Sequence, residues 1–189
     1  MSSIRLMFPA AAGLLLAACS STPTPPPALP VAVSVVSTAQ MAEANLSPAS
    51  ASIVSGRLAL VPEAGGVHVT GVIGGLRPLQ QPAFHVHQRG DCSAVDASSA
   101  GDHFNPTQQP HGAPGTGPHH LGDMPNLRAD AQGRANVDIH LRGVTLGGGA
   151  ANDIAGRALI VHAQSDDHRS QPAGNAGARI ACGLIRVTR

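Results

Sequence analysis

The stretch Ala83-Phe84-His85-Val86-His87 combines the pattern of a β-strand with two potential metal ligands. Side chains alternate between the two faces of a strand, so Phe84 and Val86 point one way and both histidines the other. We therefore expect a strand whose apolar face joins the core. Its histidines should lie outside that core, under whatever loops cover them.

Further potential ligands follow this stretch in two settings. A segment rich in Gly and Pro, a composition typical of loops, carries several of them. A second apolar strand pattern, Ala158-Leu159-Ile160-Val161, ends at another histidine. The complete candidate set is His85, His87, His103, His111, His120, Asp123 and His162.

The size and chemistry of this set indicate two neighbouring metal ions. Three imidazoles with one carboxylate make a closed tetrahedral zinc site, whereas four imidazoles favour a tetragonal Cu(II) site. Two four-coordinate ions with only seven ligands between them must share one residue. The pattern therefore predicts a bridging imidazolate.

The rest of the chain indicates an all-β, antiparallel fold. Strand-like runs are separated by turn signals, and no stretch shows a long helical period with caps. Two long loops remain, about residues 89 to 134 and 163 to 178, and loops of that length in a compact domain are usually functional. The strand-like runs are Ala44–Leu46, Ile53–Val61, Val67–Ile73, Pro82–Gln88, Ala135–Leu141, Gly156–Ala163 and Arg179–Val187.

Several motifs resemble those of the copper/zinc superoxide dismutases in their bacterial secreted form, over roughly residues 45 to 189. The resemblance implies an eight-stranded Greek-key barrel or sandwich, immunoglobulin-like in architecture, with one strand poorly indicated here. The matching motifs are Phe84-His-Val-His87, Gly101-Asp-His-Phe-Asn-Pro106, His111-Gly, His120-Leu-Gly-Asp123, Val161-His162 and Gly174-Asn-Ala-Gly-Ala-Arg179-Ile-Ala-Cys182-Gly.

Carried over position by position, the resemblance divides the ligands between two metals. Asp166 falls where the family keeps an aspartate that orients His85 and His111. His119 directly precedes His120 and is the alternative ligand at that position. The resemblance implies copper on His85, His87, His103 and His162, and zinc on His103, His111, His120 and Asp123, with His103 bridging.

The implied activity is superoxide dismutation. Copper would alternate between Cu(II) and Cu(I), turning two superoxide ions into oxygen and hydrogen peroxide, while zinc shapes the site. The resemblance gives catalytic roles to His103, as a proton carrier, and to Arg179, as a fixed cation for an anionic substrate. The chain contains no Lys, and Arg89 and Arg169 are further candidates for guiding the substrate.

Two other classes of protein compete with this interpretation. An exported domain that only buffers metal needs affinity but not Arg179, and a structural or adhesive β-domain needs no ligands. Besides His119, three histidines match no ligand of the family. We interpret His68 and His140 as ordinary strand residues and His168 as loop surface.

The N-terminal region predicts export and lipid anchoring. Residues 1–18 carry one early positive charge at Arg5 and a short apolar stretch, too short to span a bilayer, and resemble a bacterial lipoprotein signal peptide. Cys19 would be lipidated, residues 19–40 would form a Pro-rich tether, and 41–189 would form the dismutase domain. We expect the cell envelope, with the domain in the periplasm or outside. The outer membrane is favoured because Ser20 replaces the aspartate that retains lipoproteins at the inner one.

Cysteine use and charge narrow the remaining possibilities. With Cys19 lipidated in an oxidising compartment, Cys92 and Cys182 remain as one pair, and in the family this disulfide ties the metal-flanking loop to the last strand. Without residues 1–18 the chain has 11 Arg against 11 Asp and Glu, and it has no Trp or Tyr and only two Phe, which argues against nucleic acid as a partner. The sequence leaves open whether the domain is a monomer or a homodimer.

Overall fold

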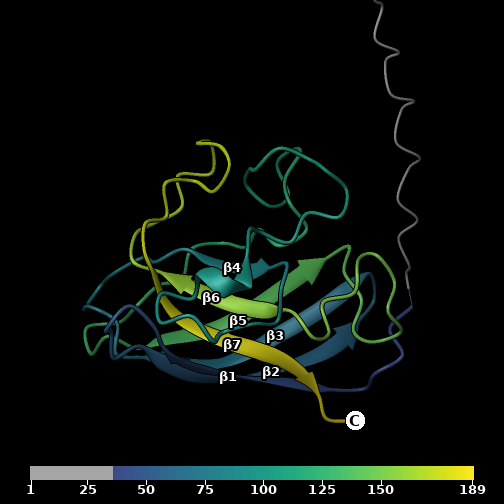
Figure 1. Cartoon of the computed structure of the whole chain (residues 1–189), viewed down its shortest axis with the longest axis horizontal. Helices are drawn as coiled ribbons and strands as arrows, with labels where there is room; N and C mark the ends of the chain where they lie inside the picture. Colours follow the sequence, from purple (N-terminus) through teal and green to yellow (C-terminus); the bar gives the residue numbers. More distant parts are fainter. Residues whose placement is uncertain (1–35) are drawn as a thin grey trace, which may run out of the picture.

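A computed structural model describes residues 36–189 and confirms the all-β, antiparallel fold (Figure 1). The predicted signal peptide, Cys19 and residues 19–35 of the tether lie outside the described residues. Within residues 36–189, no helix is long and apolar enough to cross a membrane.

Seven antiparallel strands form one curled sheet in the order β4-β6-β7-β1-β2-β3-β5. Each overlaps one of the strand ranges indicated by the sequence, and one 3-10 turn, η1 (Ser98–Ala100), lies between β4 and β5. The strands are β1 (Ala42–Pro48), β2 (Ser55–Glu63), β3 (Gly66–Gly74), β4 (Phe84–His87), β5 (Ala135–Arg142), β6 (Ala158–His162) and β7 (Arg179–Val187).

The eighth strand implied by the resemblance is not assigned in residues 36–189. A segment of the long loop nevertheless runs along the free edge of β4, where the Val86 N–H donates to the Gly122 carbonyl at 2.9 Å. The Leu127 N–H likewise donates to the carbonyl of Pro82 at 2.9 Å. This contact is therefore a set of separate bonds rather than a continuous ladder.

The strand order gathers the two long loops beside β4 and β6. The chain crosses from β3, next to one edge of the sheet, to β4 at the other edge, and then returns through residues 88–134 to β5. Residues 163–178 connect β6 to β7. Figure 1 shows both connections rising on the side of the sheet where β4 and β6 lie.

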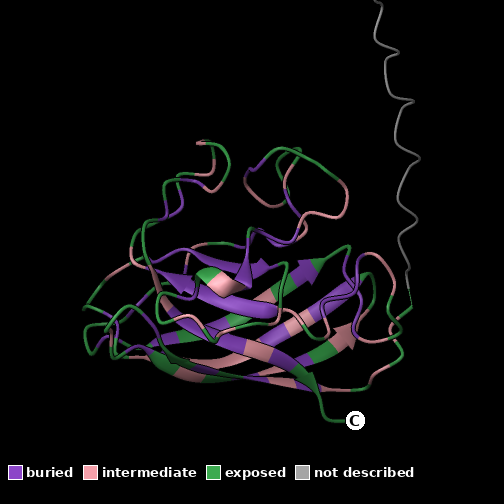
Figure 2. Ribbon diagram, in the orientation of Figure 1, coloured by how far each residue is buried: buried purple, intermediate pink, exposed green. Residues whose placement is uncertain are grey.

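Strands β4 and β6 are covered on both faces. Phe84 and Val86 of β4 belong to the main core, together with Leu58 and Leu60 of β2. The opposite face of these strands is covered by loops, and a smaller apolar cluster there joins Ile160 of β6 to the residues around η1. Every residue of β4 and β6 is consequently buried, as Figure 2 shows.

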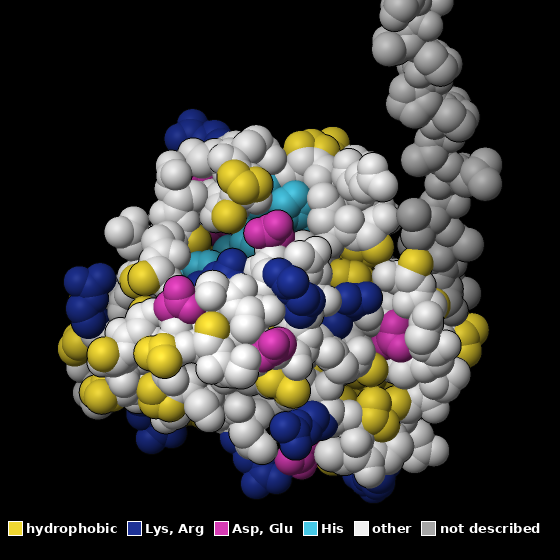
Figure 3. Space-filling view, in the orientation of Figure 1, with side chains coloured by type: hydrophobic (Ala, Val, Ile, Leu, Met, Phe, Trp, Pro, Cys, Tyr) yellow, Lys and Arg dark blue, Asp and Glu magenta, His cyan; other side chains and the backbone are white. Residues whose placement is uncertain are grey.

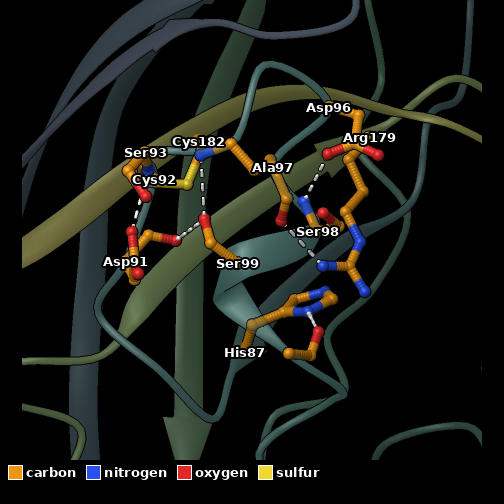
Figure 4. The surroundings of a disulfide bond; sticks show 12 residues. His87, Asp91, Cys92, Ser93, Asp96, Ala97, Ser98, Ser99, Arg179 and Cys182 are labelled. Atoms are coloured by element: carbon orange, nitrogen blue, oxygen red, sulfur yellow. Dashed lines mark hydrogen bonds between the residues drawn. A yellow bond between two sulfur atoms is a disulfide. The ribbon is translucent and has the colours of Figure 1, made fainter.

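A disulfide between Cys92 and Cys182 fastens the loop that carries η1 to β7, as the sequence predicted (Figure 4). The two cysteines are 90 residues apart in the chain. Closing a loop of that length stabilises the fold by about 4 kcal/mol in the chain-entropy model. The loop is thereby held over the face of the sheet that carries the histidines.

Candidate metal centre

Two neighbouring strands supply the first group of histidines. His85 and His87 are fully buried on the face of β4 that points away from the main core, which confirms the alternation inferred from the sequence. His162 ends β6, where a shift of register occurs between Val161 and His162. Figure 3 shows histidine side chains in a hollow of the surface, with charged side chains at its rim.

The orientation of two rings shows that this group fits a cation. His87 donates from Nδ1 to the Gly101 carbonyl at 2.7 Å, and His162 donates from Nδ1 to the Gly177 carbonyl at 3.2 Å. Each neutral ring therefore carries its lone pair on Nε2. These two Nε2 atoms face each other at 3.3 Å, an arrangement that is unfavourable unless a cation lies between them.

The second group has the dimensions of a tetrahedral zinc site. Asp123 Oδ1 lies 2.9, 3.1 and 3.3 Å from the Nδ1 atoms of His103, His111 and His120. Ligand bonds of about 2.0 Å in a regular tetrahedron place the ligand atoms about 3.3 Å apart. The four donor atoms are thus already near the separation that zinc requires.

His103 belongs to both groups, as the ligand count predicted. Its Nδ1 faces Asp123, while its Nε2 is buried without a hydrogen bond. The donor atoms of His85, His87, His103 and His162 lie within 4.8 Å of one another, and so do those of His103, His111, His120 and Asp123.

Unpaired ring nitrogens are concentrated in this region. Buried polar atoms are nearly always hydrogen-bonded, so a cluster of exceptions needs an explanation. Nδ1 of His85, Nε2 of His103, Nδ1 of His111 and Nδ1 of His120 are all buried without a hydrogen bond. Two metal ions at the two groups would account for all four.

Asp166 links the two groups through one carboxylate. His85 donates from Nε2 to Oδ2 at 2.8 Å, and His111 donates from Nε2 to Oδ1 at 2.9 Å. Because these protons occupy Nε2, both rings present Nδ1 to a ligand. A Cβ on Gly174 would come 1.8 Å from Oδ1 of Asp166, so only glycine fits beside this carboxylate.

Burial and the carboxylates set the charges of the metal-free site. Burial lowers the pKa of His85 to about 4 and that of His162 to about 3, so both rings are neutral at pH 7. Burial also acts to lower the pKa of His111, but the adjacent carboxylates of Asp123 and Asp166 outweigh burial and raise the pKa to about 9. Burial acts to raise the pKa of Asp123 and of Asp166. Hydrogen bonds from the histidines outweigh burial and hold the pKa of each carboxyl well below its usual range.

Arg179 lies at the start of β7, paired in register with His162. Its Nη1 donates to the carbonyl of Ala97, in the loop that carries η1, at 2.8 Å. Figure 4 shows the guanidinium on the same side of that loop as His87. Burial lowers the pKa of Arg179, and the charges of Asp102 and Asp96 oppose that shift. The loop that the Cys92–Cys182 disulfide fastens therefore holds the Arg179 cation next to the first group of histidines.

The structure brings together all seven predicted ligands, Asp166 and Arg179. His120 joins the second group, whereas Nδ1 of His119 donates to the Gly117 carbonyl at 2.7 Å, outside both groups. Of the two further arginine candidates, Arg89 lies beside Gly101, with its Nε 2.8 Å from where a Cβ on that glycine would be. Arg169 is exposed in the loop between β6 and β7.

Sequence reasoning missed the groups that hold these residues in place. Asn126 clamps the backbone of Asp166, accepting from its N–H at 2.8 Å and donating to its carbonyl at 2.9 Å. Asn126 stands in the long loop, 40 residues from Asp166, and nothing local indicates this contact. The backbone carbonyls of Gly101, Gly177 and Ala97 also hold side chains of the site, and the identity of a residue does not indicate what its backbone carbonyl will accept.

Comparisons with known proteins agree with this geometry. The family model described as copper/zinc superoxide dismutase (SODC) matches residues 54–185. "Superoxide dismutase [Cu-Zn] 2" of Aquifex aeolicus (strain VF5) is 42% identical over 136 residues, which cover 70% of this chain and 80% of that protein. "Superoxide dismutase [Cu-Zn] 1" of the same organism is 40% identical over 134 residues, covering 69% and 79%.

A solved structure supports the same assignment. The crystal structure of a SOD-like protein from Bacillus subtilis has 33% sequence identity and a TM-score of 0.69, and the match covers 76% of this chain and 97% of that one. The chain that folds in this way and carries both groups of ligands belongs to the copper/zinc superoxide dismutase family.

Proposed function

We propose that this protein is a superoxide dismutase that binds copper at His85, His87, His103 and His162 and zinc at His103, His111, His120 and Asp123. The observation that carries the proposal is the pair of buried donor groups that share His103. The group of four imidazoles suits Cu(II), and the group with one carboxylate suits zinc. Bound copper would supply the one-electron redox chemistry that converts two superoxide ions and two protons into oxygen and hydrogen peroxide.

His103 is proposed to handle a proton. In the metal-free site its Nε2 is buried without a hydrogen bond, while its Nδ1 is held by Asp123. A proton held at Nε2 would therefore lie on the side of the first group and could be passed to a reduced substrate. The ring would stay in place during this transfer because its other nitrogen belongs to the group that would hold zinc, where it faces Asp123.

Arg179 is proposed to attract and orient superoxide. Its guanidinium is half-buried and fixed by the Ala97 carbonyl, so the cation needs little reorganisation when an anion arrives. A domain that only stored metal would gain nothing from this cation. The presence of Arg179 beside His162 thus favours an enzyme over a metal buffer.

The test is to measure metal content and dismutation on the same sample. We expect the purified domain, supplied with both ions, to hold one copper and one zinc per chain and to accelerate the loss of superoxide. Tight binding of both ions without any dismutation would replace this proposal with the metal-buffer alternative.

We also propose that the protein is anchored in the bacterial envelope through Cys19. Leu16-Ala-Ala-Cys19 closes a short export signal, and the Pro-rich segment that follows suits a domain that stands off from a membrane. We expect the wild-type protein to fractionate with membranes, the outer one in particular, and Cys19→Ser to release it while both metals and the Cys92–Cys182 disulfide remain. A wild-type protein that is soluble in the periplasm would refute the anchor and leave the enzyme assignment intact.

A further inference from the structure

A separate pair of histidines lies on the outer face of the sheet, near the edge opposite β4. His68 of β3 and His140 of β5 are directly opposite each other in register. Their rings stack with centroids 4.3 Å apart and an interplanar angle of 11°. Their neighbours in sequence, Val67, Val69 and Leu141, are buried, so both rings point away from the core.

Each ring is held by a carboxylate from a different strand. His68 donates from Nε2 to Asp138 Oδ1 at 2.6 Å, and His140 donates from Nδ1 to Glu63 Oε2 at 2.7 Å. Glu63 ends β2 and pairs with Gly66 of β3. Three strands thus converge on one small patch, and the two bonds fix both rings.

We propose that Glu63, His68 and His140 bind one divalent transition-metal ion, separate from the copper and zinc of the metal centre. An oxygen of Glu63 and one nitrogen of each ring lie within 4.8 Å of one another, which is close enough to converge on one ion after small side-chain rotations. Two imidazoles and a carboxylate suit zinc and Cu(II), and Cu(II) binds such sites more tightly. Asp138 is the positioning residue, because its hydrogen bond sets the orientation of His68.

The patch is accessible without any movement of the backbone. The His68 and His140 side chains are 33% and 52% exposed. His140 and Asp138 also line a surface groove, together with His119. Water can therefore complete the coordination of an ion that has three protein ligands.

The test uses the holoprotein with both sites of the metal centre already filled. Titration with Zn(II), and separately with Cu(II), followed by calorimetry and by metal analysis after gel filtration, should detect one further equivalent per chain, with Cu(II) held more tightly. His68→Gln combined with His140→Gln should lose that equivalent. Glu63→Gln, which keeps the shape of the side chain, should weaken it. All of these variants should keep the original copper and zinc.

The matched control is His119→Gln, which removes a partly exposed histidine whose Nδ1 donates to the Gly117 carbonyl. It should bind the additional ion as the wild type does. The proposal is overturned if the wild-type holoprotein takes up no further ion, or if the double variant still takes it up. Because the metal centre is filled beforehand, neither result depends on whether the protein dismutates superoxide.

Discussion

Replacing Asp166 with asparagine should weaken copper binding more than zinc binding. Oδ1 of Asp166 accepts from both Nε2 of His111 and the backbone N–H of His168, whereas Oδ2 accepts from Nε2 of His85 and has Nδ1 of His168 at 3.4 Å. The single carbonyl oxygen of asparagine should therefore take the position of Oδ1, where it meets two donors. Its NH2 group then faces Nε2 of His85, where donor would meet donor.

The size of the effect follows from the bond that is lost. His85 can relieve the clash only by moving its proton to Nδ1, the atom proposed to bind copper. Losing a buried, charge-assisted hydrogen bond costs about 1.5 to 3 kcal/mol. At about 1.4 kcal/mol per factor of ten, copper affinity should fall about 10- to 100-fold. Zinc affinity should fall less, because His111 keeps its acceptor.

The assay is competition of each metal against a chelator of known affinity, at one fixed pH, for wild type and variant. The matched control is Asp167→Asn, which changes the next carboxylate along the chain. The Asp167 carboxylate accepts hydrogen bonds from the backbone N–H groups of Arg169 and Ser170, not from a histidine of the metal centre. An equal loss of both metals, or a greater loss of zinc, would refute the assignment of the two oxygens of Asp166.

Three further predictions test other parts of the centre. His162→Ala should abolish copper binding and dismutation but leave most zinc binding, measured by metal analysis; equal loss of both metals would show that the division of ligands is wrong. Arg179→Ala should keep both metals while kcat/KM falls by an amount equivalent to about 1 to 3 kcal/mol, Arg179→Lys should lose less, and unchanged kinetics would make Arg179 structural. Because the pKa of His111 is raised to about 9, the metal-free protein binds a proton there that zinc must displace, so zinc affinity should rise with pH up to about 9. Calorimetry in two buffers of different ionisation enthalpy should detect this released proton, and identical heats in the two would contradict it.

The ligand set was predictable because local pattern and chemistry agreed. Alternation alone placed His85 and His87 on one face of a strand, and the donor types alone required a shared residue. The choice between His119 and His120 was not predictable from their order. It depends on Asp123, whose Oδ2 accepts the N–H groups of His120 at 2.8 Å and of Gly112 at 3.2 Å and so shapes the loop around Oδ1.

The remaining features depend on contacts between distant segments. The clamp between Asn126 and Asp166 joins two loops, and the pairing of His68 with His140 appears only once β3 and β5 are in register. Periodicity indicates which residues face outward from a strand, but not which outward residues become neighbours. For the same reason the sequence indicated strand ranges without showing that the segment beside β4 would fall short of a strand.

The shared ring of His103 and the shared carboxylate of Asp166 make the two metal sites one thermodynamic unit. If bound zinc orders these two side chains, copper no longer has to order them, and the affinity for copper rises by some factor. Linkage then requires that bound copper raise the affinity for zinc by the same factor. The final occupancy is then independent of the order of loading. The affinity at each loading step does depend on that order, because the first ion to bind must order the shared side chains and the second binds to a site already assembled.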